Sequence, residues 1–123
     1  MRPPELLLRA IEEFNAGDYF LAHETLEILW CQERGEIRKL YQGILQVGIG
    51  LLHNRRGNYR GAVSLLRRGT GYLEPFGQLC LGIDVADLVN QTRRALAELE
   101  LLGPERFADF DPKLEPRIHL AKK

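Results

Sequence analysis

The sequence predicts an all-α protein, a compact bundle of about five helices built as two similar helical hairpins with an irregular C-terminal strap. Apolar residues recur at helical spacing, and a glycine followed by aspartate or asparagine separates the periodic runs. The longest apolar run exceeds the length of a strand and lacks alternation. The 123 residues suffice for one hydrophobic core. We therefore predict a single domain, 1–123, with a core in 1–74 and a loop, a last helix and the strap in 75–123.

The first two expected helices are separated by a clear stop and cap. A helix over 4–16 begins with proline, which suits a helix start. Its apolar residues share one stripe: Leu7, Ile11 and Phe14. Gly17 suits the end of this helix, and Asp18 suits the cap of a second one over 18–32. The second helix is expected to bury Tyr19, Ala22, Leu26 and Leu29.

The third expected helix, 36–56, is the centre of the predicted fold. Glu36 opens it, where an acidic residue suits the positive end of the helix dipole. Almost no polar face remains between Leu40 and Leu52, and a helix that is apolar all round is a buried helix. Its glycines should each cost about 1 kcal/mol relative to alanine: Gly43, Gly48 and Gly50. Close approach of a neighbouring helix is the natural compensation.

A second stop and cap, Gly57 and Asn58, repeats the first at an offset of 40 residues. The same aromatic, small and large residues follow in each copy: Tyr19, Ala22 and Leu26, then Tyr59, Ala62 and Leu66. The pattern resembles tetratricopeptide-like hairpins, although two copies are too few for a solenoid. A fourth helix is expected over 59–73, and Pro75 stops it.

The C-terminal third is expected to hold one further helix. A loop through Gly77 and Gly82 leads to Asp84, which suits a helix cap. Apolar residues then recur at helical spacing until Gly103-Pro104 terminates the helix: Val85, Leu88, Val89, Leu96 and Leu99. The tail alternates prolines with apolar residues, so we expect an extended strap laid across the helices.

The composition of the chain argues against several classes of protein. The 17 basic and 17 acidic residues give a formal net charge of zero, which argues against nucleic acid or a membrane surface as the partner. No apolar run approaches the roughly 20 residues that span a bilayer. The first residues do not resemble a secretory signal. Two cysteines, Cys31 and Cys80, are too few for a zinc knuckle. We expect a cytoplasmic protein without a membrane segment or a metal.

Charge is unevenly distributed along the chain. Residues 1–36 carry three basic and eight acidic side chains, whereas 37–73 carry seven basic and no acidic ones. One interpretation is that the basic hairpin pairs with the acidic one and with solvent. The other is an anion or phosphate patch, formed by Arg55, Arg56, Arg60, Arg67 and Arg68. The neutral net charge favours the first interpretation.

The strongest candidate site lies between the second and third helices. His23 and Glu27 project from the same helix face because they are four residues apart. The short loop predicts antiparallel packing, so residues whose numbers sum to about 69 should lie at similar heights. That pairs Glu27 with Gln42 and His23 with Gln46. The candidate pocket residues are His23, Glu24, Glu27, Trp30, Gln42, Gln46 and His53.

Three interpretations of this polar seam remain open. It is a satisfied buried network that fixes helix register. Alternatively, it is a small-molecule pocket with Trp30 and Tyr41 as walls, where His23 and Glu27 act as acid, base or ligand contacts. A metal site using His23, Glu24, Glu27 and His53 is the weakest interpretation, because two histidines at i and i+4 are missing.

These residues resemble the domain of unknown function 309 family. The matching segments are Phe14-Asn15-Ala16-Gly17-Asp18-Tyr19-Phe20, Ala22-His23-Glu24, Leu26-Glu27, Trp30, Arg38, Tyr41-Gln42-Gly43-Ile44, Gln46, His53, Arg56-Gly57-Asn58 and Gly61-Ala62. The similarity covers roughly 6–73. It implies a compact helical bundle with signature polar positions at His23, Glu24, Glu27, Gln42, Gln46 and His53. It implies no known activity.

The leading functional hypothesis is therefore a polar pocket between helices that binds a small molecule or supports an unassigned chemistry. Neither a cofactor nor enzymatic activity is assigned. One alternative is a non-enzymatic interaction module in which the seam is structural. Another is a phosphate- or RNA-binding accessory protein that uses the arginine-rich block. A homodimer through the first or the fifth helix is left open.

Overall fold

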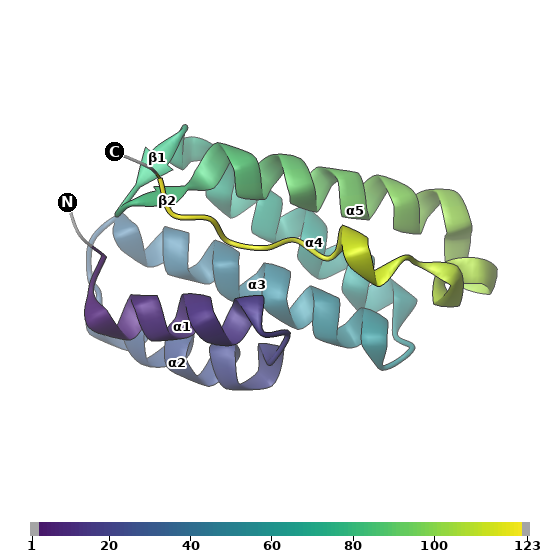
Figure 1. Ribbon diagram of the computed structural model, residues 1–123, viewed down its shortest axis with the longest axis horizontal. Helices are drawn as coiled ribbons and strands as arrows, with labels where there is room; N and C mark the ends of the chain where they lie inside the picture. Colours follow the sequence, from purple (N-terminus) through teal and green to yellow (C-terminus); the bar gives the residue numbers. More distant parts are fainter. Residues whose placement is uncertain (1–2, 122–123) are drawn as a thin grey trace.

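A computed structural model describes residues 3–121, and the fold there is a bundle of five α-helices with one small hairpin (Figure 1). The helices are α1 (Glu5–Asn15), α2 (Tyr19–Gln32), α3 (Ile37–Arg55), α4 (Tyr59–Leu73) and α5 (Val85–Arg106). The hairpin pairs β1 (Leu79–Cys80) with β2 (Ile83–Asp84). Short 3₁₀ turns are η1 (Glu74–Phe76), η2 (Phe107–Asp109) and η3 (Pro112–Leu114). The predicted all-α class is confirmed.

Consecutive helices pack against each other along the chain, and α3 makes its most extensive contacts with α4 and α2. In Figure 1, α1 and α5 lie in front, while α2, α3 and α4 lie behind them. The strap, which is the segment 107–121, runs between α1 and α5 on the front face. The core is enclosed between the two layers, and it includes Phe14, Leu40, Leu51, Leu66 and Leu88.

The repeated stop and cap is confirmed in the backbone. Gly17 and Gly57 have φ values of +80° and +82°, which a residue with a side chain rarely adopts. Asp18 accepts a hydrogen bond from the backbone N–H of Leu21 at 3.3 Å. Asn58 accepts the equivalent bond from Gly61 at 2.9 Å. The two helical hairpins therefore begin their second helices in the same way.

The backbones of α3 and α4 approach each other closely, as the glycines of α3 predicted. A methyl group at Gly69 would lie 2.9 Å from the carbonyl oxygen of Gly43 and 2.7 Å from Val47 Cγ2. A methyl group at Gly43 would lie 2.7 Å from Leu73 Cγ. A side chain at Gly69 cannot be accommodated without moving a helix, and one at Gly43 requires Leu73 to shift.

The strap completes the core on the front face. Ile118 is 2% exposed and Phe110 is 8% exposed. The Asn15 side chain donates to the Ile118 carbonyl at 2.8 Å and accepts from its N–H at 2.7 Å. Gln91 of α5 makes the equivalent pair with Arg117, at 2.9 Å in each direction. Two side-chain amides, one from α1 and one from α5, thus hold the extended strap.

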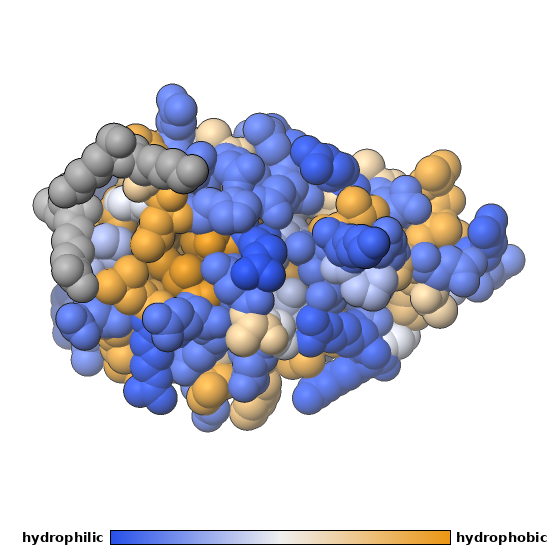
Figure 2. All heavy atoms as spheres, in the orientation of Figure 1, coloured by the Kyte–Doolittle hydropathy of each residue, from blue (hydrophilic) through white to orange (hydrophobic). Residues whose placement is uncertain are grey.

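Apolar side chains also show on this front face. Polar side chains follow most of the strap, and apolar side chains gather toward the N-terminal end of α1 (Figure 2).

Two details differ from the sequence-based expectations. The expected loop before α5 contains the β1–β2 hairpin, and Ile83 of this hairpin also bridges to Leu120 of the strap. The central helix α3 is not buried on all sides. One stripe stays half exposed: Gln42, Leu45, Gln46, Ile49, Leu52 and His53. We call these six residues the α3 stripe. They share a face because they are spaced by three or four residues.

Substitution of Gly69 by alanine should destabilise the fold. The added methyl group forces α3 and α4 apart, and overpacking of this kind costs about 1–3 kcal/mol. Gly71 is the matched control, because it lies on the same helix with no atom within 4 Å of an added Cβ. Gly71→Ala should stabilise the protein by about 0.5–1 kcal/mol. Urea unfolding measures both, and equal effects of the two substitutions would contradict the close contact.

Candidate functional site

The α3 stripe lies between α2 and α4 on the face opposite the strap. Gly48 on the α2 side of α3 faces Phe14 and Tyr19, at 3.5 and 3.9 Å from the position of a Cβ. On the α4 side, Gly43 and Gly50 face Leu73 and Leu66. With both flanks occupied and the core on the third side, the fourth side of α3 is left uncovered. The α3 stripe is this fourth side.

His23 and Glu27 lie together on α2, as their spacing predicts. His23 Nε2 lies 3.4 Å from Glu27 Oε2, and the two side chains are 29% and 55% exposed. The other ring nitrogen, Nδ1, is buried without a hydrogen-bond partner among residues 3–121. Glu24 is exposed to solvent. The α2 border of the stripe is therefore acidic, with one unsatisfied imidazole nitrogen.

Trp30 and Arg38 confirm the antiparallel register of α2 and α3. The guanidinium carbon of Arg38 lies 3.6 Å from the centre of the Trp30 ring, and its Nε donates to the Trp30 carbonyl at 3.2 Å. Their residue numbers sum close to the predicted value of about 69. Trp30 remains half exposed at this end of the α2 border.

Gln46 opens toward α4 rather than only toward α2. It lines a surface hollow of about 380 Å³ together with Arg68, Gly71 and Tyr72. Its Oε1 atom is buried and has no hydrogen-bond partner in the part of the chain that the structure describes. The sequence rule predicted the height of Gln46 but not this second neighbour. The structure thus joins a residue of the candidate pocket to one of the candidate anion patch.

The remaining candidates of the pocket are dispersed. His53 lies at the far end of α3, where its Nδ1 atom is 3.4 Å from the side-chain nitrogen of Asn58. Tyr41 is 3% exposed and belongs to the core. Burial raises the pKa of Tyr41, and the nearby charges of Glu33 and Cys80 add to this effect. Tyr41 is therefore a core residue rather than a pocket wall.

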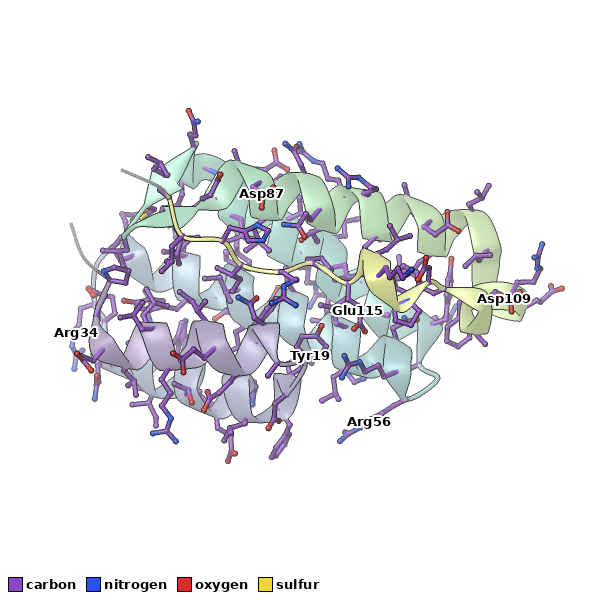
Figure 3. The ribbon with its side chains drawn as sticks, viewed as in Figure 1. Tyr19, Arg34, Arg56, Asp87, Asp109 and Glu115 are labelled. Carbon is purple, nitrogen blue, oxygen red and sulfur yellow. The ribbon has the colours of Figure 1, made fainter. Side chains whose placement is uncertain are left out.

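Arg55 forms a junction of three segments instead of an open anion site. It donates to both carboxylate oxygens of Glu115, at 2.9 and 2.7 Å, and to the Gly17 carbonyl at 2.7 Å. Its guanidinium lies over the Tyr19 ring at 4.5 Å. The hydrogen bond to Glu115 raises the pKa of Arg55. Burial raises the pKa of Tyr19, and the charge of Glu115, which lies close by in Figure 3, raises it further.

The other arginines of the block differ in their partners. Arg67 pairs with Glu100 of α5 at 2.7 Å. Within residues 3–121, no ion pair forms at Arg56, Arg60 or Arg68. Arg60, Arg67 and Arg68 line a hollow of about 420 Å³ along α4. The acidic partners of the basic block therefore lie in the C-terminal third of the chain. The sequence had instead suggested that they would lie in the N-terminal hairpin.

Other residues limit the chemistry that this surface can support. Among residues 3–121, no three His, Cys, Asp or Glu side chains are grouped so that they could hold a metal ion. Cys31 is exposed, and burial raises the pKa of Cys80. None of the helices in the described range is long and apolar enough to cross a membrane.

Sequence reasoning did not anticipate apolar exposure on the bundle surface. The large apolar side chains with more than a third of their surface exposed include Phe20, Ile28, Tyr72 and Leu101. Phe20 and Tyr72 border the two sides of the α3 stripe, on α2 and α4. The sequence of α2 contained a signal for this exposure, because two of its apolar residues fall outside the helix stripe that faces the core.

The fold and this surface define an all-helical domain with an uncovered central helix. Residues 7–65 match a family model described as a domain of unknown function (DUF309). YpuF of Bacillus subtilis strain 168, an uncharacterized protein, is 30% identical over 129 residues, which cover 98% of this chain and 74% of YpuF. The chain belongs to the domain of unknown function 309 family.

A second relative is an uncharacterized protein of Aquifex aeolicus strain VF5. It is 34% identical over 104 residues, which cover 84% of this chain. The aligned part is 31% of that protein's length, so this chain corresponds to less than a third of it. Both relatives are described as uncharacterized proteins.

Replacement of Arg55 by methionine should destabilise the protein by about 1–3 kcal/mol, because hydrogen bonds to a charged group are lost and Glu115 keeps no counter-charge. Arg56→Met is the matched control, since the Arg56 side chain points away from the bundle (Figure 3) and is exposed. It should change stability by less than about 0.5 kcal/mol. Thermal and urea unfolding of both variants would show the difference. Similar losses for the two would contradict the junction.

Proposed function

We propose that the protein is a non-enzymatic binding module that docks a partner on the α3 stripe. The main observation is that three large apolar side chains on one face of the central helix, Leu45, Ile49 and Leu52, are only partly buried, although Leu45 and Leu52 also contact the core. Apolar side chains that recur along a surface face in this way are typical of a site that another molecule covers.

The composition of the borders supports a protein partner. Trp30 of α2 and Tyr72 of α4 flank the α3 stripe, and aromatic residues are enriched where proteins meet. Gln42 and Gln46 interrupt the apolar side chains with groups that both donate and accept hydrogen bonds. The repeat of three and four residues suits a partner helix lying along α3.

The chemistry of His23 supports binding rather than catalysis. A general base needs a partner that orients it and a substrate position within reach. Glu27 could orient His23 through Nε2, but the other ring nitrogen, Nδ1, is buried and has no substrate position within reach among residues 3–121. Two unpaired thiols suit a reducing compartment, so we assign the module to the cytoplasm.

A small anionic ligand is the second candidate, and the unpartnered Gln46 Oε1 favours it. The hollow measures about 380 Å³ and is widely open to solvent, so a ligand there would stay partly exposed. Arg68 would hold a carboxylate or phosphate group, and the accessible part of Gln46 would contact the same ligand. Tyr72 would contact its apolar part.

Selection of helical peptides tests the docking function without a known partner. Peptides displayed on phage should bind the wild-type protein and be lost against Ile49→Glu, which puts a charge into the centre of the stripe. Leu101→Glu is the control, because Leu101 is 80% exposed at the end of α5 and lies away from the stripe. Peptides that bind both variants equally, or no selected peptides against a chain that is monomeric in solution, would refute the docking function.

A thermal-shift screen of anionic metabolites tests the second candidate. A ligand of the Gln46 hollow should stabilise the wild-type protein and bind Arg68→Gln at least tenfold more weakly, because one charge-assisted hydrogen bond is lost. Arg60→Gln on the same helix serves as the control. A ligand that is insensitive to Arg68, or an absence of any shift across the screen, would rule this candidate out.

A further inference from the structure

We infer that the occupant of the α3 stripe is a second copy of this chain, related by a two-fold axis that runs along α3. The inference rests on the proposed docking function and names its partner. Charge complementarity across the stripe carries it. The α2 border is acidic, with Glu24 and Glu27, and the α4 border is basic, with Arg68.

Symmetry decides how these borders meet. A two-fold axis along α3 exchanges the two sides of the stripe, so that α2 of one copy faces α4 of the other. The acidic border then meets the basic one twice in each dimer. A two-fold axis across the helices would instead place α2 against α2, with acidic side chains opposed. Coulombic repulsion disfavours that arrangement and favours the axis along α3.

The heights along the helices agree with this pairing. The contact of Trp30 with Arg38 sets the height of α2 relative to α3, and the contact of Gly69 with Val47 sets that of α4. From these anchors, Glu24 and Arg68 lie within about four residues of each other along α3, or about 6 Å. Two long side chains span that separation. The structure shows no ion pair for either Glu24 or Arg68 within residues 3–121.

Two further groups gain partners in the same arrangement. Tyr72 comes within about three residues of the height of Glu27, or about 4.5 Å, where its phenol can donate to a carboxylate whose only ion-pair partner in the described chain is His23. Along the axis, each residue of the stripe meets its own counterpart. Apolar Leu45 and Ile49 pair with themselves, and carboxamides are self-complementary because each carries a donor and an acceptor. Gln46 is only partly buried, so the accessible part of its carboxamide can then pair with a carboxamide of the other copy.

Charge reversal with complementation tests the interface. Sedimentation equilibrium from about 1 to 500 µM should show a dimer for the wild-type chain. Glu24→Arg and Arg68→Glu should each weaken the dimer at least tenfold, because each opposes like charges. An equimolar mixture of the two variants should restore a heterodimer, since the introduced arginine of one chain then faces the introduced glutamate of the other. The controls Glu105→Arg and Arg60→Glu reverse exposed charges outside the face and should leave dimerisation unchanged.

The outcomes separate this inference from the docking function. A wild-type chain that is monomeric throughout the range overturns self-pairing, and the peptide selection then decides the docking function alone. A dimer that persists in Ile49→Glu uses another face and also overturns self-pairing. Failure of the mixture to restore a dimer overturns the axis along α3. Circular dichroism melting of every variant shows that the fold is retained, so that loss of the dimer is not loss of structure.

Discussion

The contact between the backbones of α3 and α4 at Gly43 and Gly69 determines how the remaining elements are arranged. It brings α4 so close to α3 that no side chain fits between them at this point. The α2 hairpin packs on the opposite flank at ordinary van der Waals distances, around Gly48. With α4 on one flank and α2 on the other, the core lies on one remaining side of α3. The last side has no element of the described chain to cover it, and it carries the α3 stripe.

The C-terminal segment covers the core side and not the stripe. Arg55 joins the end of α3 to the Gly17 turn and to Glu115 of the strap, so one side chain holds three segments that are far apart in the sequence. Asn15 and Gln91 hold the strap further along with backbone-like hydrogen bonds. Because the strap is fixed on the front between α1 and α5, it cannot reach the opposite face. Among residues 3–121, no segment covers the α3 stripe.

Helices and caps could be predicted from sequence because their signals are local. The adjacent residues Gly17 and Asp18 are sufficient to predict the end of one helix and the start of the next. The β1–β2 hairpin could not, because its two-residue strands depend on Leu120, far along the chain. The role of Arg55 was hidden for the same reason, since Glu115 is sixty residues away. For Gln46, a rule about antiparallel helices predicts height along the axis but does not say which flank the side chain faces. The open side of α3 was missed because an apolar helix normally indicates burial.

The chemistry of the uncovered face also limits what can occupy it. Gln46 Oε1 and His23 Nδ1 are buried polar atoms without partners in the described chain, and such atoms cost free energy unless an occupant or water satisfies them. Arg68 offers a positive charge beside Gln46, whereas Glu24 and Glu27 offer negative charges on the other border. An occupant therefore needs an acidic group near α4, a basic group near α2 and apolar side chains between them. A second copy of the same face, turned about α3, meets all three requirements at once, whereas a small anion meets only the first.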